Sequence, residues 1–174
     1  MMFGLTVVRP DDVIKGALDL VIKKAKELWK IDYGGIFPTE SGFGKTSLRP
    51  IHVGVTGTTD QWVFNLTEAG RNTIIDTTIS EDAFIILEGF ANPQSLSDRI
   101  ETALQIEAGG DVLPIINLLE AYTMDTRINR WYFEQPIVVQ PRSPLKVHLF
   151  APKTGTTNFG LIGTTIAKRS YLIK

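Results

Sequence analysis

The periodicity of apolar residues changes once along this chain, near residue 35, and this change constrains the fold more than any other feature. Before it, apolar residues recur three or four positions apart, which is the spacing of one face of an α-helix. They are Ile14, Leu18, Val21, Ala25 and Leu28. After it, apolar and polar residues alternate between closely spaced turn signals, which is typical of a β-sandwich or barrel. The sequence therefore predicts an N-terminal helical arm over residues 1–35 and a β-sandwich domain over residues 36–174.

The first segment, from Asp11 to about Ile31, also carries the end signals of a helix. Acidic residues open it and lysines close it, which complements the two ends of the helix dipole. Pro10 precedes it, and Gly34 and Gly35 follow it. Its amphipathic stripe is too apolar to face water. We expect the helix to pack on its own sandwich, on a neighbouring subunit or on a membrane surface.

Two downstream segments alternate most clearly as strands. Their apolar members are Trp62, Phe64 and Leu66 in the first and Leu145, Val147 and Leu149 in the second. Further strands are expected at residues 51–55, 83–87, 127–133, 137–140 and 159–172, the last with an irregularity at Gly163. Strand ends or edges are expected at Pro114, Pro136, Pro141 and Pro144. The total is about eight strands, without the alternating helices of a parallel sheet.

Residues 96–108 fit two patterns. Apolar and polar side chains alternate there as in a strand, but Leu96, Ile100 and Leu104 also share one helical face. A Gly109-Gly110 pair follows, and this pair favours a hairpin turn and hence a strand. A short helical turn is expected around residues 117–122.

Composition excludes several classes of protein. With 18 basic and 19 acidic side chains, the chain lacks the basic excess with which proteins neutralise nucleic-acid phosphates. The absence of cysteine removes disulfides, thiolate nucleophiles and cysteine-ligated metal sites. The N-terminus has no basic region of a signal peptide, and no apolar run is long enough to span a bilayer. We therefore expect a protein that is soluble or lies at most against a membrane surface.

The strongest motif candidate is segment 39–46, which nearly matches a phosphate-binding loop. Gly44, Lys45 and Thr46 are in register, but Thr39 occupies the position of the first glycine. Its Cβ restricts the tight turn, and a strand rather than a helix is expected afterwards. The segment is better interpreted as a flexible loop.

The other chemical candidates also favour structural roles. His52 and His148 are the only histidines, and neither has metal-ligand spacing, so we expect surface or structural side chains, with His148 facing solvent. Carboxylates at Glu81-Asp82 and at Glu101 and Glu107 could form a glycosidase pair, but are more typical of solvated faces. The chain is therefore not expected to be an enzyme, and we predict no catalytic, cofactor-binding or metal-binding residues.

Aromatic residues could build a carbohydrate-stacking platform from Trp62, Trp131 and Tyr132. Trp62 alternates with Phe64, and Trp131 alternates with Phe133, as core residues do. We therefore expect both tryptophans in the core and Tyr132 as the more exposed ring.

Three stretches carry a resemblance to a known family. They run from Ala108 through the segment ending at Val139, from Pro141 to Val147, and over the closing strand from Phe159 to Ala167. In strand spacing and turn placement, residues 50–174 resemble a single jelly-roll coat protein. The size and the N-terminal arm are similar to the small major capsid proteins of tailless icosahedral, membrane-containing bacteriophages. The resemblance implies a virion shell of many copies around a lipid layer, together with a second capsid protein, and it carries over no site residues.

Three hypotheses follow. The first is a structural viral capsid protein that self-assembles into an icosahedral shell, with internal membrane contact through the N-terminal helix and no specific nucleic acid. The alternative is a carbohydrate- or receptor-binding module, such as a phage fibre or lectin-like domain. The third is an enzyme on a sandwich scaffold. A binding module predicts exposed aromatic rings near loop tips, whereas a capsid subunit predicts apolar patches on sheet faces or edges.

Overall fold

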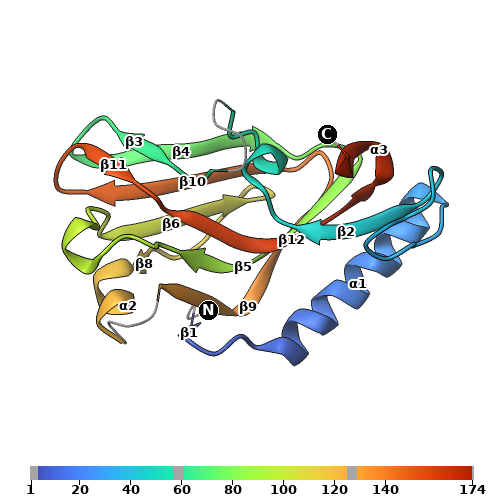
Figure 1. Ribbon diagram of the computed structural model, residues 1–174, viewed down its shortest axis with the longest axis horizontal. Coiled ribbons are helices and arrows are strands. Elements are labelled where there is room, and N and C mark those ends of the chain that lie inside the picture. The colour runs from blue at the N-terminus through green and yellow to red at the C-terminus, as the bar shows by residue number, and fades with distance from the viewer. Residues whose placement is uncertain (1–3, 57–60, 125–128, 174) are drawn as a thin grey trace.

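The structure is a computed structural model that describes residues 4–56, 61–124 and 129–173. Its secondary structure is mainly β with antiparallel sheets, as the sequence predicts. Two larger sheets lie one over the other, and a long helix lies outside one of them (Figure 1). The larger buried cluster of apolar side chains draws on strands of both sheets. The alternation after residue 35 therefore builds a two-layered sandwich.

The elements of the described residues are as follows. The longer strands are β2 (Phe43–Ser47), β4 (Gly70–Thr78), β5 (Ala83–Ala91), β6 (Ala103–Ala108), β9 (Arg130–Val139), β10 (Pro144–Ala151) and β12 (Gly160–Lys168). The shorter strands are β1 (Leu5–Thr6), β3 (Phe64–Leu66), β7 (Asp111–Val112), β8 (Ile116–Asn117) and β11 (Gly155–Thr157). The helices are α1 (Asp11–Trp29), α2 (Leu118–Met124) and α3 (Arg169–Leu172), and the 3₁₀ turns are η1 (Pro50–Val53) and η2 (Leu96–Asp98).

The strand order follows a regular rule. One sheet has the order β1-β9-β5-β12-β2 and the other has β4-β10-β6-β7, with β8 also on β6, while β3 and β11 form a separate ribbon. If β1, β3, β8 and β11 are set aside, the remaining strands pair first with last and so inwards along the chain. The pairs are β2 with β12, β4 with β10, β5 with β9, and β6 with β7. Successive pairs alternate between the two sheets.

The core lies between the sheets. The alternation predicted for residues 145–149 is confirmed, since the fully buried side chains there are Leu145, Val147 and Leu149. On the facing sheet, the ring of Phe90 stacks against Trp131 and Phe159, with ring centroids 5.4 Å apart in both pairs. The predicted core position of Trp131 is therefore correct, whereas Trp62, also predicted in the core, is only half-buried and precedes β3.

Helix α1 packs on the outer side of the first sheet, over β9, β5 and β12. Val21 and Ala25 are fully buried there and join Phe84, Ile86 and Ile166 in a second apolar cluster. This contact stabilises the helix, because most of the stability of a helix in a protein comes from the packing of its apolar face. Of the three expected positions for the helix, the structure places it on its own sandwich.

The predicted apolar stripe of the helix is wrong at one residue. Leu28 is 57% exposed, and Trp29 packs on the sheet instead. The Trp29 ring meets Phe43 and Phe84 edge-on, with centroids 5.4 and 5.5 Å away. At about 100° per residue, Leu28 and Trp29 flank the centre of the stripe to a similar extent, so the helical period alone does not choose between them. The contacts of Trp29 with Phe43 and Phe84 decide which of the two is covered.

Several predicted strand boundaries are also wrong. The strand expected at residues 51–55 is the 3₁₀ turn η1, whose first residue is Pro50. The strand expected to reach residue 172 ends at Lys168, where α3 begins. At residues 96–108 the strand prediction holds for β6, whereas η2 occupies the beginning of the segment. Short apolar runs do not distinguish these local structures, because packing decides between them.

Pro136 does not end a strand as predicted. Strand β9 runs through it without a break, whereas the sequence indicated two strands at 127–133 and 137–140. Along β5, the pairing register shifts between Leu87 and Gly89, opposite this part of β9. A proline is tolerated at such an irregularity because no ladder hydrogen bond needs its missing N–H. The first residues of the predicted strand at 127–133 lie outside the described residues.

Two predicted turns and one predicted irregularity are confirmed. Gly109 and Gly110 connect β6 to β7 with φ of +63° and +95°, the left-handed backbone that a two-residue hairpin requires. The helical turn expected around residues 117–122 is α2. The register of β12 against β5 shifts between Ile162 and Gly163, as expected at that glycine.

Candidate functional site

The segment resembling a phosphate-binding loop is part of a sheet. Gly44, Lys45 and Thr46 lie in β2 and pair with β12, so the loop predicted for residues 39–46 is wrong for this half, whereas residues 39–42 form a turn before the strand. The backbone N–H of Lys45 donates to the carbonyl of Gly35 at 2.9 Å. Amides that pair with neighbouring backbone cannot converge on a phosphate, and a 3₁₀ turn rather than an α-helix follows. The geometry therefore does not support a nucleotide site.

Both histidines are buried and structural. His148 is 3% exposed, so the predicted solvent exposure is wrong. Its Nδ1 lies 3.0 Å from Thr73 Oγ1, and its Nε2 lies 3.0 Å from Glu107 Oε1. The Nδ1 of His52 lies 2.8 Å from Thr165 Oγ1. Within the described ranges, no group of three or more histidines, aspartates and glutamates could hold a metal ion.

The carboxylates considered as a catalytic pair have separate partners. Glu101 is 1% exposed and accepts hydrogen bonds from Asn92 Nδ2, from Tyr122 Oη and, at 2.9 Å, from Thr157 Oγ1. Burial, with the charge of Glu101 beside it, raises the pKa of Tyr122 far above its ordinary value.

The other carboxylates bind different partners, and Glu107 binds His148 and Arg71. Glu81 pairs with Arg142, and Asp82 pairs with Lys168 at 2.7 Å. Each of these four carboxylates therefore binds residues other than another carboxylate.

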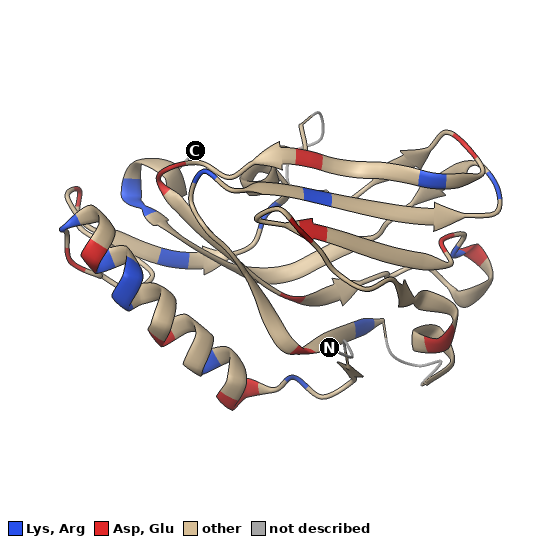
Figure 2. Cartoon of the chain, turned by 180° about the vertical axis from the view of Figure 1, so that it is seen from behind, with Lys and Arg blue, Asp and Glu red and all other residues tan. Residues whose placement is uncertain are grey.

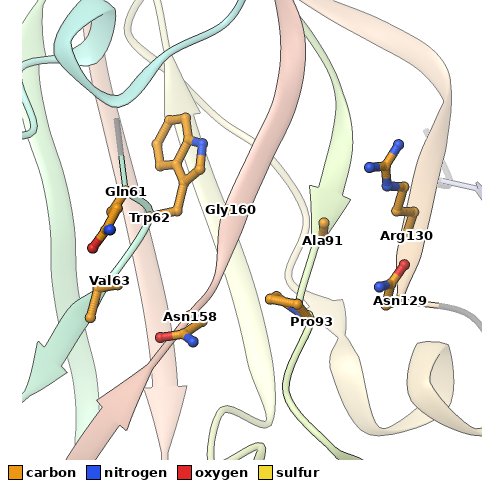
Figure 3. Close-up of a pocket in the computed structure, with 9 residues that line it drawn as sticks. All are labelled: Gln61, Trp62, Val63, Ala91, Pro93, Asn129, Arg130, Asn158 and Gly160. Atoms are coloured by element: carbon orange, nitrogen blue, oxygen red, sulfur yellow. The ribbon is translucent and has the colours of Figure 1, made fainter. Parts of the chain in front are cut away.

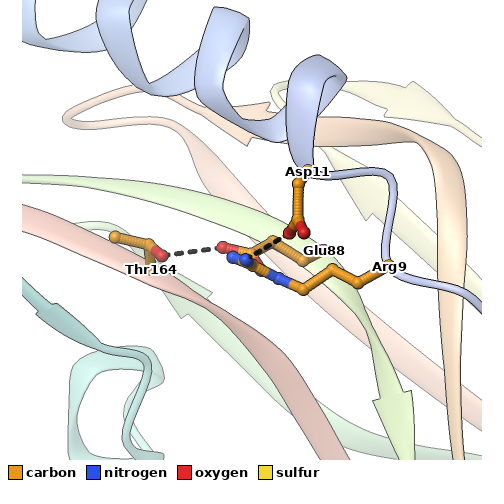
Figure 4. Close-up of polar contacts among 4 residues, drawn as sticks. All are labelled: Arg9, Asp11, Glu88 and Thr164. Carbon is orange, nitrogen blue, oxygen red and sulfur yellow. Dashed lines mark hydrogen bonds and ion pairs between the residues drawn. The ribbon is translucent and has the colours of Figure 1, made fainter.

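A buried ion pair ties the N-terminal segment to the sheet. Glu88 of β5 is 2% exposed and accepts from Arg9 Nη2 at 2.9 Å and Nε at 3.2 Å. The hydroxyl of Thr164 in β12 donates to the other carboxylate oxygen at 2.7 Å. Arg9 also reaches Asp11 at the start of α1, so the four side chains converge between arm and sheet (Figure 4). The hydrogen bonds to Glu88 raise the pKa of Arg9.

The surface of α1 carries charges of both signs. Lysines and acidic residues alternate along the helix, as Figure 2 shows. Anionic membranes and nucleic acids attract surfaces with a basic excess, which this helix does not have. No helix within the described ranges is long and apolar enough to cross a membrane.

Exposed apolar side chains gather at one end of the sandwich, next to α3. Ile36, Phe37 and Ile173 are 63%, 91% and 72% exposed, and they border one hollow of about 350 Å³. Arg169 is the single charged residue in its lining. We call this surface the α3-end patch. The exposure of Phe37 is unusual, because a phenylalanine ring normally avoids water.

A second apolar hollow lies at the other end, next to α2. Ile115 and Met124 are 58% and 55% exposed and border a space of about 360 Å³ together with Leu5. Glu120 is the single charged residue in its lining. We call this surface the α2-end patch. Helices α2 and α3 lie at opposite ends of the long axis of the molecule (Figure 1).

The comparisons with protein families and with curated sequences give no relative. No protein-family model matches the chain, and no curated protein sequence matches it. The candidate site therefore rests on the geometry alone, and its main features are the two end patches. Sequence reasoning missed them, because the residues of each patch come from separate segments of the chain. The one signal was the apolar pair Ile36-Phe37, which follows Gly34 and Gly35 between α1 and β2.

Proposed function

We propose that this chain is a structural, non-enzymatic coat subunit built on a single jelly roll. The support for the jelly roll is the pairing of β2 with β12, β4 with β10, β5 with β9, and β6 with β7. A long antiparallel hairpin that is rolled up in this way gives two facing four-stranded sheets, as in the jelly rolls of viral capsids, lectins and cupins. Among these we favour a capsid subunit because apolar patches lie at two opposite ends, although they lie beside α2 and α3 and not on the sheet faces or edges that the sequence-based criterion named.

The observation that carries the proposal is the presence of two different apolar patches at opposite ends. A patch that pairs with itself gives a closed dimer, whereas two different patches that pair head to tail give rings or filaments. The α3-end patch projects Phe37, and the α2-end patch offers a hollow of about 360 Å³ to receive a side chain. Arg169 at one end and Glu120 at the other are complementary in charge. We therefore propose a second copy of this chain as the occupant of each patch.

Light scattering on the purified chain, followed by electron microscopy, tests this proposal. We expect a concentration-dependent increase in mass beyond a dimer, and closed particles in the micrographs. Replacing the exposed ring in Phe37→Ser should weaken association at least about tenfold, since the buried ring would contribute about 1.5–3 kcal/mol. Leu20→Ser, at an apolar position on α1 that is 52% exposed, is the matched control and should assemble normally.

A mixing experiment distinguishes head-to-tail contacts from other contacts. Phe37→Ser keeps an intact α2 end, and Met124→Ser keeps an intact α3 end. A mixture of the two should form dimers and nothing larger, because only one contact can form between them. A strict monomer at about millimolar concentration, or a wild-type dimer that grows no further, would overturn the proposal.

Three features of the coat hypothesis stay predictions. They are the second capsid protein, the location in a virion and contact with an internal membrane. The apolar stripe of α1 lies on its own sheet through Val21 and Ala25, so membrane contact would have to use another face of the helix.

A further inference from the structure

An outward-facing trough lies on the sheet β1-β9-β5-β12-β2, at the edge where β5 ends and β12 begins. It encloses about 470 Å³, and its lining includes Trp62, Ala91, Arg130 and Gly160. Trp62 and Arg130 lie on opposite sides of the strands that carry Gly160 and Ala91 (Figure 3). The trough is separate from both end patches, since it shares no lining residue with either.

Small residues at matched positions create this trough. Gly160 of β12 pairs with Ala91 of β5, and Ala91 pairs with Arg130 of β9, so the three form one row across the sheet. The neighbouring residues Phe90 and Trp131 point into the core. Since adjacent side chains in a strand point to opposite faces, the row faces outward. Gly160 lies under the Trp62 ring, since a Cβ there would be 3.0 Å from Trp62 Cδ1, and the small Ala91 leaves space between Trp62 and the long Arg130.

The lining has a particular chemistry. Apolar surface comes chiefly from the half-buried Trp62, from Val63 and from Pro93. The polar side chains are three amides, from Gln61, Asn129 and Asn158. Arg130 is the single charged residue, and it is exposed. Within the part of the chain that the structure describes, no carboxylate lies within ion-pair distance of Arg130.

We propose that this trough binds a saccharide that carries a carboxylate. Sugars present an apolar face of C–H groups, which packs on an aromatic ring, and a rim of hydroxyl groups, which amides recognise because they both donate and accept hydrogen bonds. A guanidinium matches a carboxylate with two parallel hydrogen bonds. Trp62, the three amides and Arg130 supply these elements around one space large enough for a small ligand.

Two other ligand classes fit the trough less well. A nucleotide would bring several phosphate charges, and one arginine is the only cation in the lining. A purely apolar peptide would bury the amides and the guanidinium without hydrogen-bonding partners, which is unfavourable. The ligand is therefore expected to combine hydroxyl groups, a C–H face and one anionic group.

Binding to a printed panel of neutral and carboxylated oligosaccharides tests the proposal. The carboxylated set contains uronic-acid and sialic-acid sugars, and hits are titrated by tryptophan fluorescence. We expect saturable binding to members of the carboxylated set. Ala91→Leu, which fills the floor, should weaken it at least about tenfold. Arg130→Gln should weaken the binding of carboxylated sugars to a similar extent and leave the binding of neutral sugars unchanged.

The matched control is Arg142→Gln, which removes an arginine that is exposed and paired with Glu81, outside the trough. It should bind as the wild type does, and thermal melting should show that every variant is folded. The proposal is overturned if no sugar binds saturably at millimolar concentration, or if binding survives both Ala91→Leu and Arg130→Gln. It does not depend on the proposed coat function, because Phe37→Ser, which disrupts assembly, should bind the same sugars.

Discussion

Gly89 shows at the scale of one residue how β5 and β9 approach each other. A Cβ atom at this position would lie 2.0 Å from the carbonyl oxygen of Trp131, well inside van der Waals contact. The partner atom belongs to the backbone, so it cannot rotate away. Gly89 lies at the register shift between these two strands, where the local backbone is drawn together. Glycine is therefore required here for its lack of a side chain.

We predict that Gly89→Ala lowers the free energy of unfolding by at least about 2 kcal/mol, as clashes in the core do. The matched control is Gly16→Ala in α1, where an added Cβ meets nothing within 4 Å. It should raise the free energy of unfolding by about 0.5–1 kcal/mol, since alanine favours a helix over glycine. Urea unfolding measures both. An unchanged midpoint for Gly89→Ala would contradict the packing described here.

Tyr122 is buried beside Glu101, and this position raises the pKa of its hydroxyl. In the unfolded chain a tyrosine loses its proton near pH 10, at about its ordinary pKa. In the folded chain Tyr122 keeps its proton well above that pH. The unfolded state therefore binds fewer protons above pH 10, and the contribution of this group to stability is lost as the pH rises further.

We predict that the wild type loses stability with pH more steeply than Tyr122→Phe above pH 10. The difference in slope should approach about 1.4 kcal/mol for each pH unit, which corresponds to one proton, once the pH exceeds the ordinary pKa of tyrosine. Urea unfolding at pH 9, 10 and 11 measures it. The raised pKa values of Tyr33 and Tyr171 act equally in both proteins and cancel. Parallel slopes for the two proteins would refute the assignment to Tyr122.

Some residue-scale predictions could be made from sequence and others could not. Trp131 was predicted in the core because it alternates with Phe133 along one strand. The contact of His148 with Glu107 was not predicted, because 41 positions separate the two residues in the chain. Alternation reports which face of a strand a side chain occupies. It does not report which neighbouring strand covers that side chain.

At the scale of elements, α1 is held by an apolar face and by the ion pair of Arg9 with Glu88. The carboxylate of Glu88 is 2% exposed, so it depends on its hydrogen bonds for the solvation that water would otherwise supply. Arg9 and Thr164 provide these bonds from the arm and from β12. The N-terminal segment is thus tied directly to the centre of the sheet.

We predict that Arg9→Met lowers the free energy of unfolding by about 1–2 kcal/mol, because it leaves a buried carboxylate without its charged partner. The expected loss of stability is modest because the Arg9 side chain is 45% exposed. Asp11→Asn is the control, because it removes only the outer ion pair and should cost about 0–1 kcal/mol. Chemical denaturation compares the two, and equal effects would show that burial of Glu88 is not decisive.

Elements with strong periodicity were predicted more reliably than short ones. The helix at 11–29 carries a long periodic pattern, residues 145–149 alternate, and residues 83–87 form a continuous apolar run, so local sequence and packing agree there. At 51–55, Pro50 begins a 3₁₀ turn and Gly54 ends it with a φ of +76°, although the segment has the apolar content of a strand. At Pro136 the expected strand end was wrong, because the partner strand β5 has a register shift there and needs no N–H group from residue 136.

At the scale of the whole molecule, the pairing of first strand with last and so inwards distributes the strands over two facing sheets. This arrangement leaves α2 at one end and α3 at the other, each beside exposed apolar side chains (Figure 1). With a formal net charge of −1, the molecule has little self-repulsion to oppose contact between copies. The proposed head-to-tail assembly uses both ends and leaves the trough at Trp62 facing outward.

The sequence alone determined that a helix precedes a mainly β, antiparallel fold, because side-chain periodicity is a local property that fixes which faces are buried. Only the tertiary structure decided where distant segments meet. The row of Gly160, Ala91 and Arg130, the burial of Glu88 under Arg9, and the two end patches all depend on it. The physical reason is that strand order and register follow from the packing of the whole core, which no single segment encodes.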